Sequence, residues 1–205
     1  MNIQLAPDGQ LRISWYTPDT ECLGPGKRFA LWVQGCRQRC EGCIAQSLQR
    51  LDGGVLWKID DLVYEIILSG ADGLSISGGE PFLQSQALAT LIRSVRQHCP
   101  RRGVIVYTGL LYEELVKDSD AIELIAQTDL LIDGVYISEL DDGKAMRGSS
   151  NQRLIILTNI YSDSDLPTSR TNKVIFTGSM FRMVGIPSKG AKEFLDIMKA
   201  EEKHE

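Results

Sequence analysis

The sequence lacks the features that mark membrane proteins, secreted proteins and nucleic-acid-binding proteins. No apolar run approaches the ~18 residues of a membrane span, and residues 1–10 have neither a basic start nor an apolar core. Lysine and arginine together number 22 against 27 aspartates and glutamates, which gives a formal net charge of −5, and no long basic run occurs. Because phosphate binding needs clustered positive charge, we expect no nucleic-acid partner. Without a membrane span or a leader-like start, we expect a cytoplasmic protein with no membrane partner.

The composition excludes disorder as the main state and fits one domain. Hydrophobic residues make up 43% and charged residues 24% of the 205 residues, which is ordinary for a folded protein. We expect a single domain over residues 1–205, with an N-terminal hairpin in 1–20, a core in 21–158 and a C-terminal extension in 159–205. Five cysteines without a secretory signal favour thiolate chemistry or metal binding over a disulfide framework.

Alternating apolar and amphipathic stretches predict an α/β fold. Two strand-like runs around Pro7-Asp8-Gly9, at residues 3–5 and 11–15, predict an N-terminal hairpin. Buried strands are expected at 28–34, 73–77, 104–107, 130–132 and 154–157, and helices at about 60–69, 84–98, 112–117 and 121–127. This alternation implies parallel strands joined by crossover helices. The C-terminal extension departs from it, with a hairpin at 173–176 and 180–184 around Gly178-Ser179 and a helix at about 189–203.

Three cysteines, Cys36, Cys40 and Cys43, form a C-x3-C-x2-C loop directly after the first buried strand. Gly35 and Gly42 allow the backbone to bend, so three thiolates can converge on one metal centre. An ordinary [4Fe–4S] cluster uses four cysteines, so three ligands would leave one iron open to a small molecule. Two alternatives remain: a structural zinc site completed by Cys22, His98 or Cys99, and three thiols that line a core. Neither Cys22 nor Cys99 receives a role of its own.

A second motif, Gly78-Gly79-Glu80-Pro81, follows the next buried strand. Consecutive glycines permit a close approach that side chains would block, so their carbonyls can meet an ammonium group beside the Glu80 carboxylate. The alternative is a plain strand-to-helix turn with Pro81 in the first helical turn.

The two motifs together resemble the radical S-adenosylmethionine (SAM) superfamily. The resemblance implies a partial, open (βα) barrel of about five or six mostly parallel strands. It implies that Cys36, Cys40 and Cys43 bind three irons of a [4Fe–4S] cluster while the amino and carboxylate groups of S-adenosylmethionine bind the fourth. The reduced cluster would then split the cofactor into methionine and a 5′-deoxyadenosyl radical. Gly78, Gly79 and Glu80 would hold the methionyl amino group.

Further stretches resemble the small activating enzymes of anaerobic ribonucleotide reductase. They are the Gly24-Pro25-Gly26-Lys27-Arg28 entry, the Asp133-Gly134 pair and the motif Arg147-Gly148-Ser149-Ser150-Asn151-Gln152-Arg153. After Cys43 this chain has Ile44 where that family usually carries an aromatic residue or histidine. The resemblance implies an oxidoreductase that makes a glycyl radical on a partner protein, with no catalytic residue beyond the cluster and cofactor ligands. The expected cofactor contacts also include Thr108, Asp133, Arg147, Asn151 and Gln152.

The basic residues around the cysteine loop suggest an electron donor. Lys27, Arg28, Arg37, Arg39 and Arg50 form a positive rim that would steer an acidic flavodoxin or ferredoxin. The equal alternative is that these residues form an ordinary solvated loop face that binds no electron donor. Two further functions stay open: radical chemistry on a small molecule or ribosomal peptide, and a non-catalytic iron–sulfur protein that carries electrons or acts as a sensor.

Overall fold

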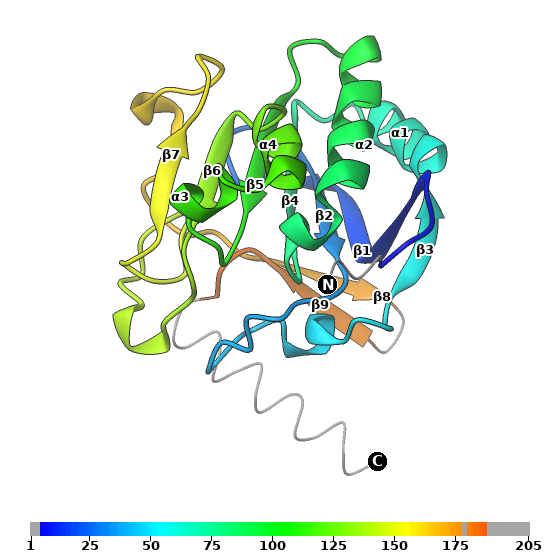
Figure 1. The fold of residues 1–205 in the computed structure, drawn as a ribbon. Helices are drawn as coiled ribbons and strands as arrows, with labels where there is room; N and C mark the ends of the chain where they lie inside the picture. The colour runs from blue at the N-terminus through cyan, green and yellow to red at the C-terminus, as the bar shows by residue number, and fades with distance from the viewer. Residues whose placement is uncertain (1–4, 178–179, 188–205) are drawn as a thin grey trace.

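The computed structural model describes residues 5–177 and 180–187, which form a seven-stranded sheet and a separate two-stranded hairpin (Figure 1). In spatial order the large sheet consists of β3 (Val55–Lys58), β1 (Gln10–Thr20), β2 (Arg28–Val33), β4 (Gly73–Gly78), β5 (Gly103–Tyr107), β6 (Leu130–Asp133) and β7 (Arg153–Ile156). The central strands β2, β4, β5 and β6 are parallel, and the outer strands pair antiparallel. The fold is therefore mixed α/β with a mostly parallel central sheet.

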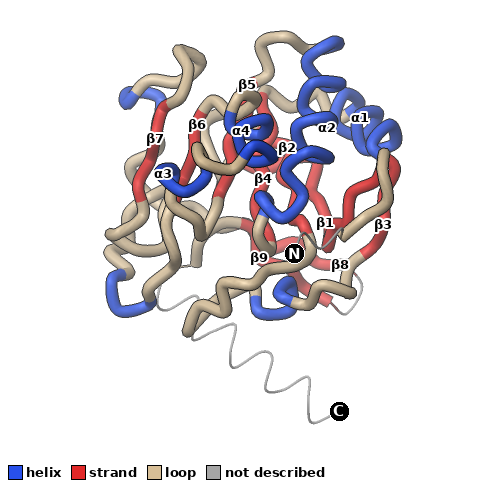
Figure 2. Tube along the Cα trace, viewed as in Figure 1, coloured by secondary structure: helices blue, strands red, loops and turns tan. Residues whose placement is uncertain are grey.

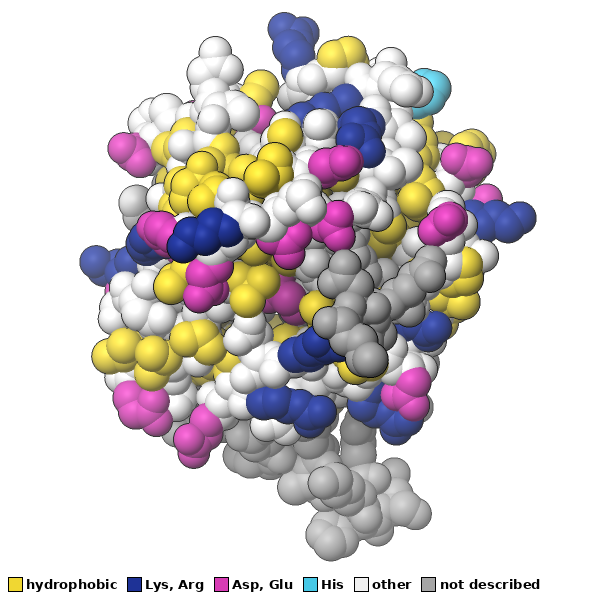
Figure 3. All heavy atoms as spheres, in the orientation of Figure 1, with side chains coloured by type: hydrophobic (Ala, Val, Ile, Leu, Met, Phe, Trp, Pro, Cys, Tyr) yellow, Lys and Arg dark blue, Asp and Glu magenta, His cyan; other side chains and the backbone are white. Residues whose placement is uncertain are grey.

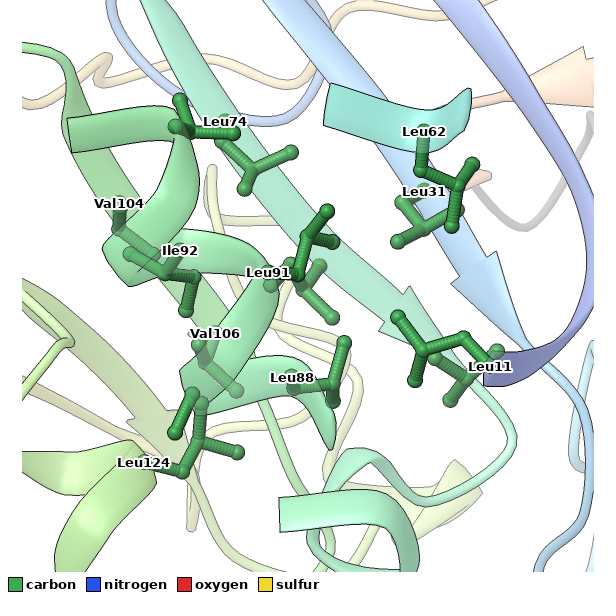
Figure 4. Packing of buried hydrophobic residues seen from close by; sticks show 14 of the residues in the cluster. Leu11, Leu31, Leu62, Leu74, Leu88, Leu91, Ile92, Val104, Val106 and Leu124 are labelled. Carbon is green, nitrogen blue, oxygen red and sulfur yellow. The ribbon is translucent and has the colours of Figure 1, made fainter. Parts of the chain in front are cut away.

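Helices cover one face of this sheet, as Figures 1 and 2 show. The α-helices are α1 (Ile59–Leu68), α2 (Ser85–His98), α3 (Tyr112–Leu115) and α4 (Ser119–Ile125), and the 3-10 turns are η1 (Gln46–Gln49), η2 (Pro81–Gln84), η3 (Ser138–Leu140) and η4 (Asp163–Asp165). In α2 the spacing of Leu88, Leu91 and Ile92 places all three on the sheet side, where they are fully buried (Figure 4). They meet Leu74 and Val106 from the strands, and this apolar contact forms the main core.

The opposite face of the sheet is also buried. Ile105 and Ile132 pack with Met146 and Tyr161. Ala30 packs with Val184 from the hairpin formed by β8 (Lys173–Thr177) and β9 (Met180–Val184). Because both faces are covered, the central strands are nearly continuous apolar runs, as parallel strands usually are.

A buried arginine ties the amino ends of the parallel strands to the C-terminal extension. Arg28 is 1% exposed and donates from Nη1 to Tyr161 Oη at 2.6 Å. Its Nη2 donates to the carbonyls of Leu74 at 2.8 Å and Gly103 at 3.0 Å, and its Nε donates to Ser75 Oγ at 3.0 Å. The cysteine loop lies at the other end of β2. The expectation that Arg28 belongs to a positive rim around the cysteines is therefore wrong.

One expectation about the outer strands is wrong: β7 runs antiparallel to β6 and not parallel. Strand β3 was not among the predicted strands. Of the predicted N-terminal hairpin, the second run forms part of β1, which pairs with β2 and β3, and Leu5 of the first run lies outside any strand; residues 1–4 are outside the described residues. The predicted hairpin in the extension is confirmed as β8–β9, whereas the helix at about 189–203 lies outside the described residues. The sheet ends in two edge strands, and the open barrel stays a prediction.

Within the described residues, no helix combines the length and apolar character needed to cross a membrane.

The bracing role of Arg28 predicts a large loss of stability when its charge is removed. Arg28→Met keeps the aliphatic length but leaves several buried acceptors without donors, so we expect the free energy of unfolding to fall by about 3–5 kcal/mol. Tyr161→Phe removes one hydrogen bond and should cost about 1 kcal/mol. Urea unfolding followed by circular dichroism measures both, and an Arg28→Met protein as stable as wild type would contradict the bracing role.

Candidate iron–sulfur and cofactor site

The three predicted cluster ligands lie together in the loop that follows β2. Cys36, Cys40 and Cys43 are free thiols and all are half-buried. The loop turns sharply because Arg39 and Gly42 both have left-handed backbone conformations, with φ of 52° and 67°. The backbone N–H of Cys43 donates to the carbonyl of Cys40 at 3.3 Å, which closes the second turn. The loop therefore wraps its thiols around a common space.

The electrostatics of this space favour a cation. Burial raises the pKa of the Cys36 and Cys40 thiols, and the neighbouring thiols and the Glu80 carboxylate raise it further. The backbone acts in the opposite direction: Gln38 N–H donates to Cys36 Sγ at 3.4 Å, and the nearby backbone of Tyr136 lowers the pKa of the Cys40 thiol. Since these thiols resist ionisation alone, positively charged iron would bind them with release of protons.

The described residues do not form the alternative zinc site. Among residues 5–177 and 180–187, no three His, Cys, Asp or Glu side chains lie close enough to hold a single ion. The residues proposed to complete a zinc site also lie elsewhere. Cys22 packs with the β8–β9 hairpin, and Cys99 follows α2 beside Ala71, near the amino end of β4. In a [4Fe–4S] cluster each thiolate binds a different iron, so the three cysteines of this loop can supply three of its ligands.

The Gly-Gly-Glu motif lies directly against the start of the cysteine loop. Gly79 N–H donates to the Val33 carbonyl at 2.8 Å, and Glu80 N–H donates to the Gly35 carbonyl at 2.7 Å. A Cβ at Gly79 would lie 2.2 Å from the Gly35 oxygen, and a Cβ at Gly78 would lie 2.4 Å from the Val33 oxygen. No side chain fits at either position. The structure thus brings together the two motifs that the sequence separates by some thirty-five residues.

Glu80 is a buried carboxylate at the carboxyl ends of β4 and β5. Its side chain accepts hydrogen bonds from Thr108 Oγ1 at 2.7 Å, Gly109 N–H at 2.9 Å and Phe82 N–H at 3.1 Å. The residue is 2% exposed, and burial raises its pKa. Glu80 and Thr108, both predicted as cofactor contacts, therefore form one unit beside the thiols, and a cationic ligand would favour its charged form.

The remaining predicted contacts lie in a second group around the end of β6. Asp133 is fully buried, forms an ion pair with Arg153 and accepts a hydrogen bond from Tyr112 N–H at 2.8 Å. Arg153 also pairs with the exposed Glu113, and this contact lowers the pKa of Glu113 to about 2. Both Asp133 oxygens already have partners within the protein.

The predicted contacts in the 147–153 motif are also bonded to the protein. Asn151 Nδ2 donates to the Val135 carbonyl at 2.8 Å, and Gln152 Nε2 donates to the Gly134 carbonyl at 2.7 Å. Arg147 pairs with Asp142, although its Nε is one of two buried side-chain atoms without a partner in the described part of the chain. The structure places these residues against the loop after β6 and not beside Glu80.

Comparison with known proteins agrees with this cysteine loop. Residues 22–155 match the protein family described as "4Fe-4S single cluster domain". The chain is 34% identical over 147 residues to the anaerobic ribonucleoside-triphosphate reductase-activating protein of Haemophilus influenzae, covering 67% of this chain and 92% of the relative. It is 32% identical over 136 residues to the protein of that name from Enterobacteria phage T4 (64% and 85%), and 31% over 147 residues to that of Escherichia coli K12 (67% and 93%). The chain belongs to this family of activating proteins.

The family match also distinguishes the matched 4Fe-4S domain from the segments that follow it in the chain. It ends within β7, so Tyr161 and the β8–β9 hairpin lie outside the matched 4Fe-4S domain. These additions cover the sheet face opposite the helices. In this activating protein, that face is therefore closed by residues that the family match does not include.

The basic rim around the cluster loop is smaller than predicted. Arg37, Arg39 and Arg50 are exposed near the cysteines, and Arg50 pairs with Asp52 at 3.1 Å. Lys27, like Arg28, lies at the far end of β2. Figure 3 shows both basic and acidic side chains in the lower part of that view. Tyr136 also lies beside the cluster loop, near Gly42, although it was not predicted as a site residue. The sequence indicated it only by its position, as an aromatic residue two places after Gly134.

The contact between Gly79 and Gly35 predicts a sharp difference between two glycine substitutions. Gly79→Ala forces two backbone segments apart, so we expect it to destabilise the protein by about 3 kcal/mol and to lower the iron bound after anaerobic reconstitution. Gly109→Ala is the control, because the atom nearest to its Cβ would belong to the flexible Gln38 side chain, at 3.1 Å, and Glu80 Oε2 would lie at 3.6 Å, an ordinary contact distance. Iron and sulfide analysis measures the effect, and full iron loading of Gly79→Ala would show that this contact does not shape the loop.

Proposed function

We propose that this chain is a radical SAM activating enzyme that makes a glycyl radical on an anaerobic ribonucleotide reductase. One observation carries the proposal: the loop with Cys36, Cys40 and Cys43 lies against the buried Glu80 carboxylate at the carboxyl ends of the parallel strands. The names of the relatives support the partner, and the family match supports the cluster.

When bound, the cluster and S-adenosylmethionine would supply reductive cleavage of the cofactor's sulfonium C–S bond and abstraction of a hydrogen atom from the partner's glycine. The protein's own contribution would be position and charge. Cys36, Cys40 and Cys43 would hold the cluster and would leave one of its irons to the cofactor. Carboxyl ends of parallel strands are where ligands of α/β folds usually bind.

The unit of Glu80 and Thr108 would hold the amino end of the cofactor. Thr108 Oγ1 and Gly109 N–H fix the carboxylate, so its negative charge stays close to the thiols. The Gly78 and Gly79 carbonyls lie next to it and can accept from an ammonium group. In the second group, Arg147 Nε is a buried donor that a cofactor carboxylate could use. Asp133, Asn151 and Gln152 would act on the cofactor only through the loops that they hold.

The exposed Arg37 and Arg39 would meet the electron donor. Both lie between cluster ligands, so an acidic flavodoxin or ferredoxin bound there would be close to the cluster. Glu41 in the same loop reduces this charge.

The assignment of Glu80 predicts separate effects on the cluster and on cofactor binding. Glu80→Gln should keep the iron content of the reconstituted protein but weaken S-adenosylmethionine binding about 10- to 100-fold, because a charge-assisted contact contributes about 1.5–3 kcal/mol. Anaerobic calorimetry measures the affinity. A Cys36→Ala variant is the matched control, since it should lose the cluster itself. Unchanged affinity in Glu80→Gln would remove Glu80 from the cofactor site.

The reaction is tested with the reconstituted protein under anaerobic conditions. After reduction with dithionite we expect equal amounts of methionine and 5′-deoxyadenosine by mass spectrometry, and none from the Cys36→Ala variant. With an anaerobic ribonucleotide reductase added, a glycyl radical signal should appear in the electron paramagnetic resonance spectrum. Cofactor cleavage without any partner radical would retain the radical initiator and reject the proposed partner.

A further inference from the structure

Exposed apolar side chains gather where three loops meet at the carboxyl ends of the central strands. They are Ile44 in the cysteine loop, Leu111 after β5, and Val135 and Leu140 after β6, and their exposed fractions lie between 37% and 49%. A single exposed apolar residue is common on any protein, whereas a group of them is typical of an interaction site. We call these four residues the apolar patch.

A backbone hydrogen bond brings two members of the patch together. The N–H of Gly134 donates to the carbonyl of Leu110 at 3.1 Å, which joins the loop after β6 to the loop after β5. Leu111 and Val135 each come next in the chain after one of these bonded residues. The two side chains therefore belong to one joined pair of loops.

A close contact places the other two members beside the cysteine loop. A Cβ at Gly42 would lie 3.3 Å from the Cβ of Ser138, so these two backbone segments adjoin. Ile44 and Leu140 each come two positions later in the chain. The apolar patch thus extends from the cysteine loop across the loop after β6 to the end of β5.

The 147–153 motif holds the backbone of the patch. Asn151 Nδ2 donates to the carbonyl of Val135 at 2.8 Å, and the N–H of Ser150 donates to the carbonyl of Leu140 at 2.7 Å. A surface that is already fixed loses less conformational freedom when a partner binds. The motif therefore presents Val135 and Leu140 in a prepared position.

The exposed charges beside the patch are mainly acidic. Glu114 follows Leu111 by three residues, Glu139 directly precedes Leu140, and both carboxylates are on exposed residues. The nearby arginines Arg147 and Arg153 are paired with carboxylates. Figure 3 shows hydrophobic and acidic side chains together at the lower left of that view.

The basic residues of the cysteine loop lie in its first half. Arg37 lines a cavity between residues 5–10 and the start of α2, on the helix side of the sheet. An acidic electron donor would be attracted to Arg37 and Arg39 and repelled by the acidic side. Charge therefore leaves the apolar patch to a different partner.

We propose that the apolar patch is the surface on which the anaerobic ribonucleotide reductase docks, through apolar and basic side chains of its own. The inference rests on the proposed function, from which it takes the partner. A hydrogen atom passes only between groups in contact, so the protein that supplies it must cover the surface next to the cysteine loop. The apolar patch lies there, and its acidic border selects a basic partner surface.

The test places a positive charge in the patch. In the reconstituted full-length protein, Leu111→Lys and Leu140→Lys should each raise the dissociation constant for an anaerobic ribonucleotide reductase at least about 10-fold, measured by calorimetry without S-adenosylmethionine. Both variants should form 5′-deoxyadenosine at the wild-type rate when no reductase is present. Leu68→Lys is the matched control, because Leu68 is 67% exposed on α1, away from the patch, and should bind the reductase as wild type does.

Four results would overturn the inference. The first two are wild-type affinity in both patch variants and a wild-type protein that does not bind the reductase. In the third, the patch variants keep the reductase but require more flavodoxin for cluster reduction, which would assign the patch to the electron donor. In the fourth, sedimentation shows that wild type self-associates and the patch variants do not, which would assign the patch to a second copy of the chain.

Failure of the proposed function would look different. Because binding is measured without S-adenosylmethionine, it does not depend on the radical reaction. A wild-type protein that binds the reductase through the patch but forms no glycyl radical would reject the reaction and retain the docking surface.

Discussion

Two backbone hydrogen bonds, from Gly79 N–H to Val33 and from Glu80 N–H to Gly35, determine the geometry of the site. They join the carboxyl end of β4 to the residues that lead into the cysteine loop. The contact is possible only because Gly78 and Gly79 carry no side chain there. Through it, a buried carboxylate is placed beside the thiols of the cysteine loop. The same two hydrogen bonds thus explain both the close packing of the two segments and the negative charge near the thiols.

The rest of the fold keeps that edge in place. Helices bury one face of the sheet, and the extension buries the other through Val184 and Tyr161. Arg28 braces the opposite end of the strands by donating to β4, β5 and Tyr161. Its guanidinium tolerates burial because neutral oxygen acceptors surround its donors. The cysteine loop therefore starts from a strand that is packed on both faces.

Local patterns in the sequence predicted most of the central elements. The spacing of Leu88 and Leu91 and the apolar run of β2 reflect burial directly, so α2 and the parallel strands were predicted correctly. Short edge strands depend on partners far along the chain, so β3 and the direction of β7 were not predictable. For the same reason Arg28 suggested a positive rim for an electron donor, and the amides of Asn151 and Gln152 suggested cofactor contacts. Each of these side chains bonds to the protein's own backbone or side chains. The sequence shows that such a side chain can donate hydrogen bonds, but it does not show which group accepts them.

The central claim is that three thiols hold a cluster with one iron left to S-adenosylmethionine. The most direct measurement is electron–nuclear double resonance of the reduced, reconstituted protein with cofactor labelled by 15N at its amino group. Our account predicts a 15N coupling to the cluster, because the amino group would bind the open iron beside Glu80. A normal cluster spectrum that shows no 15N coupling and does not change when the cofactor is added would contradict the claim.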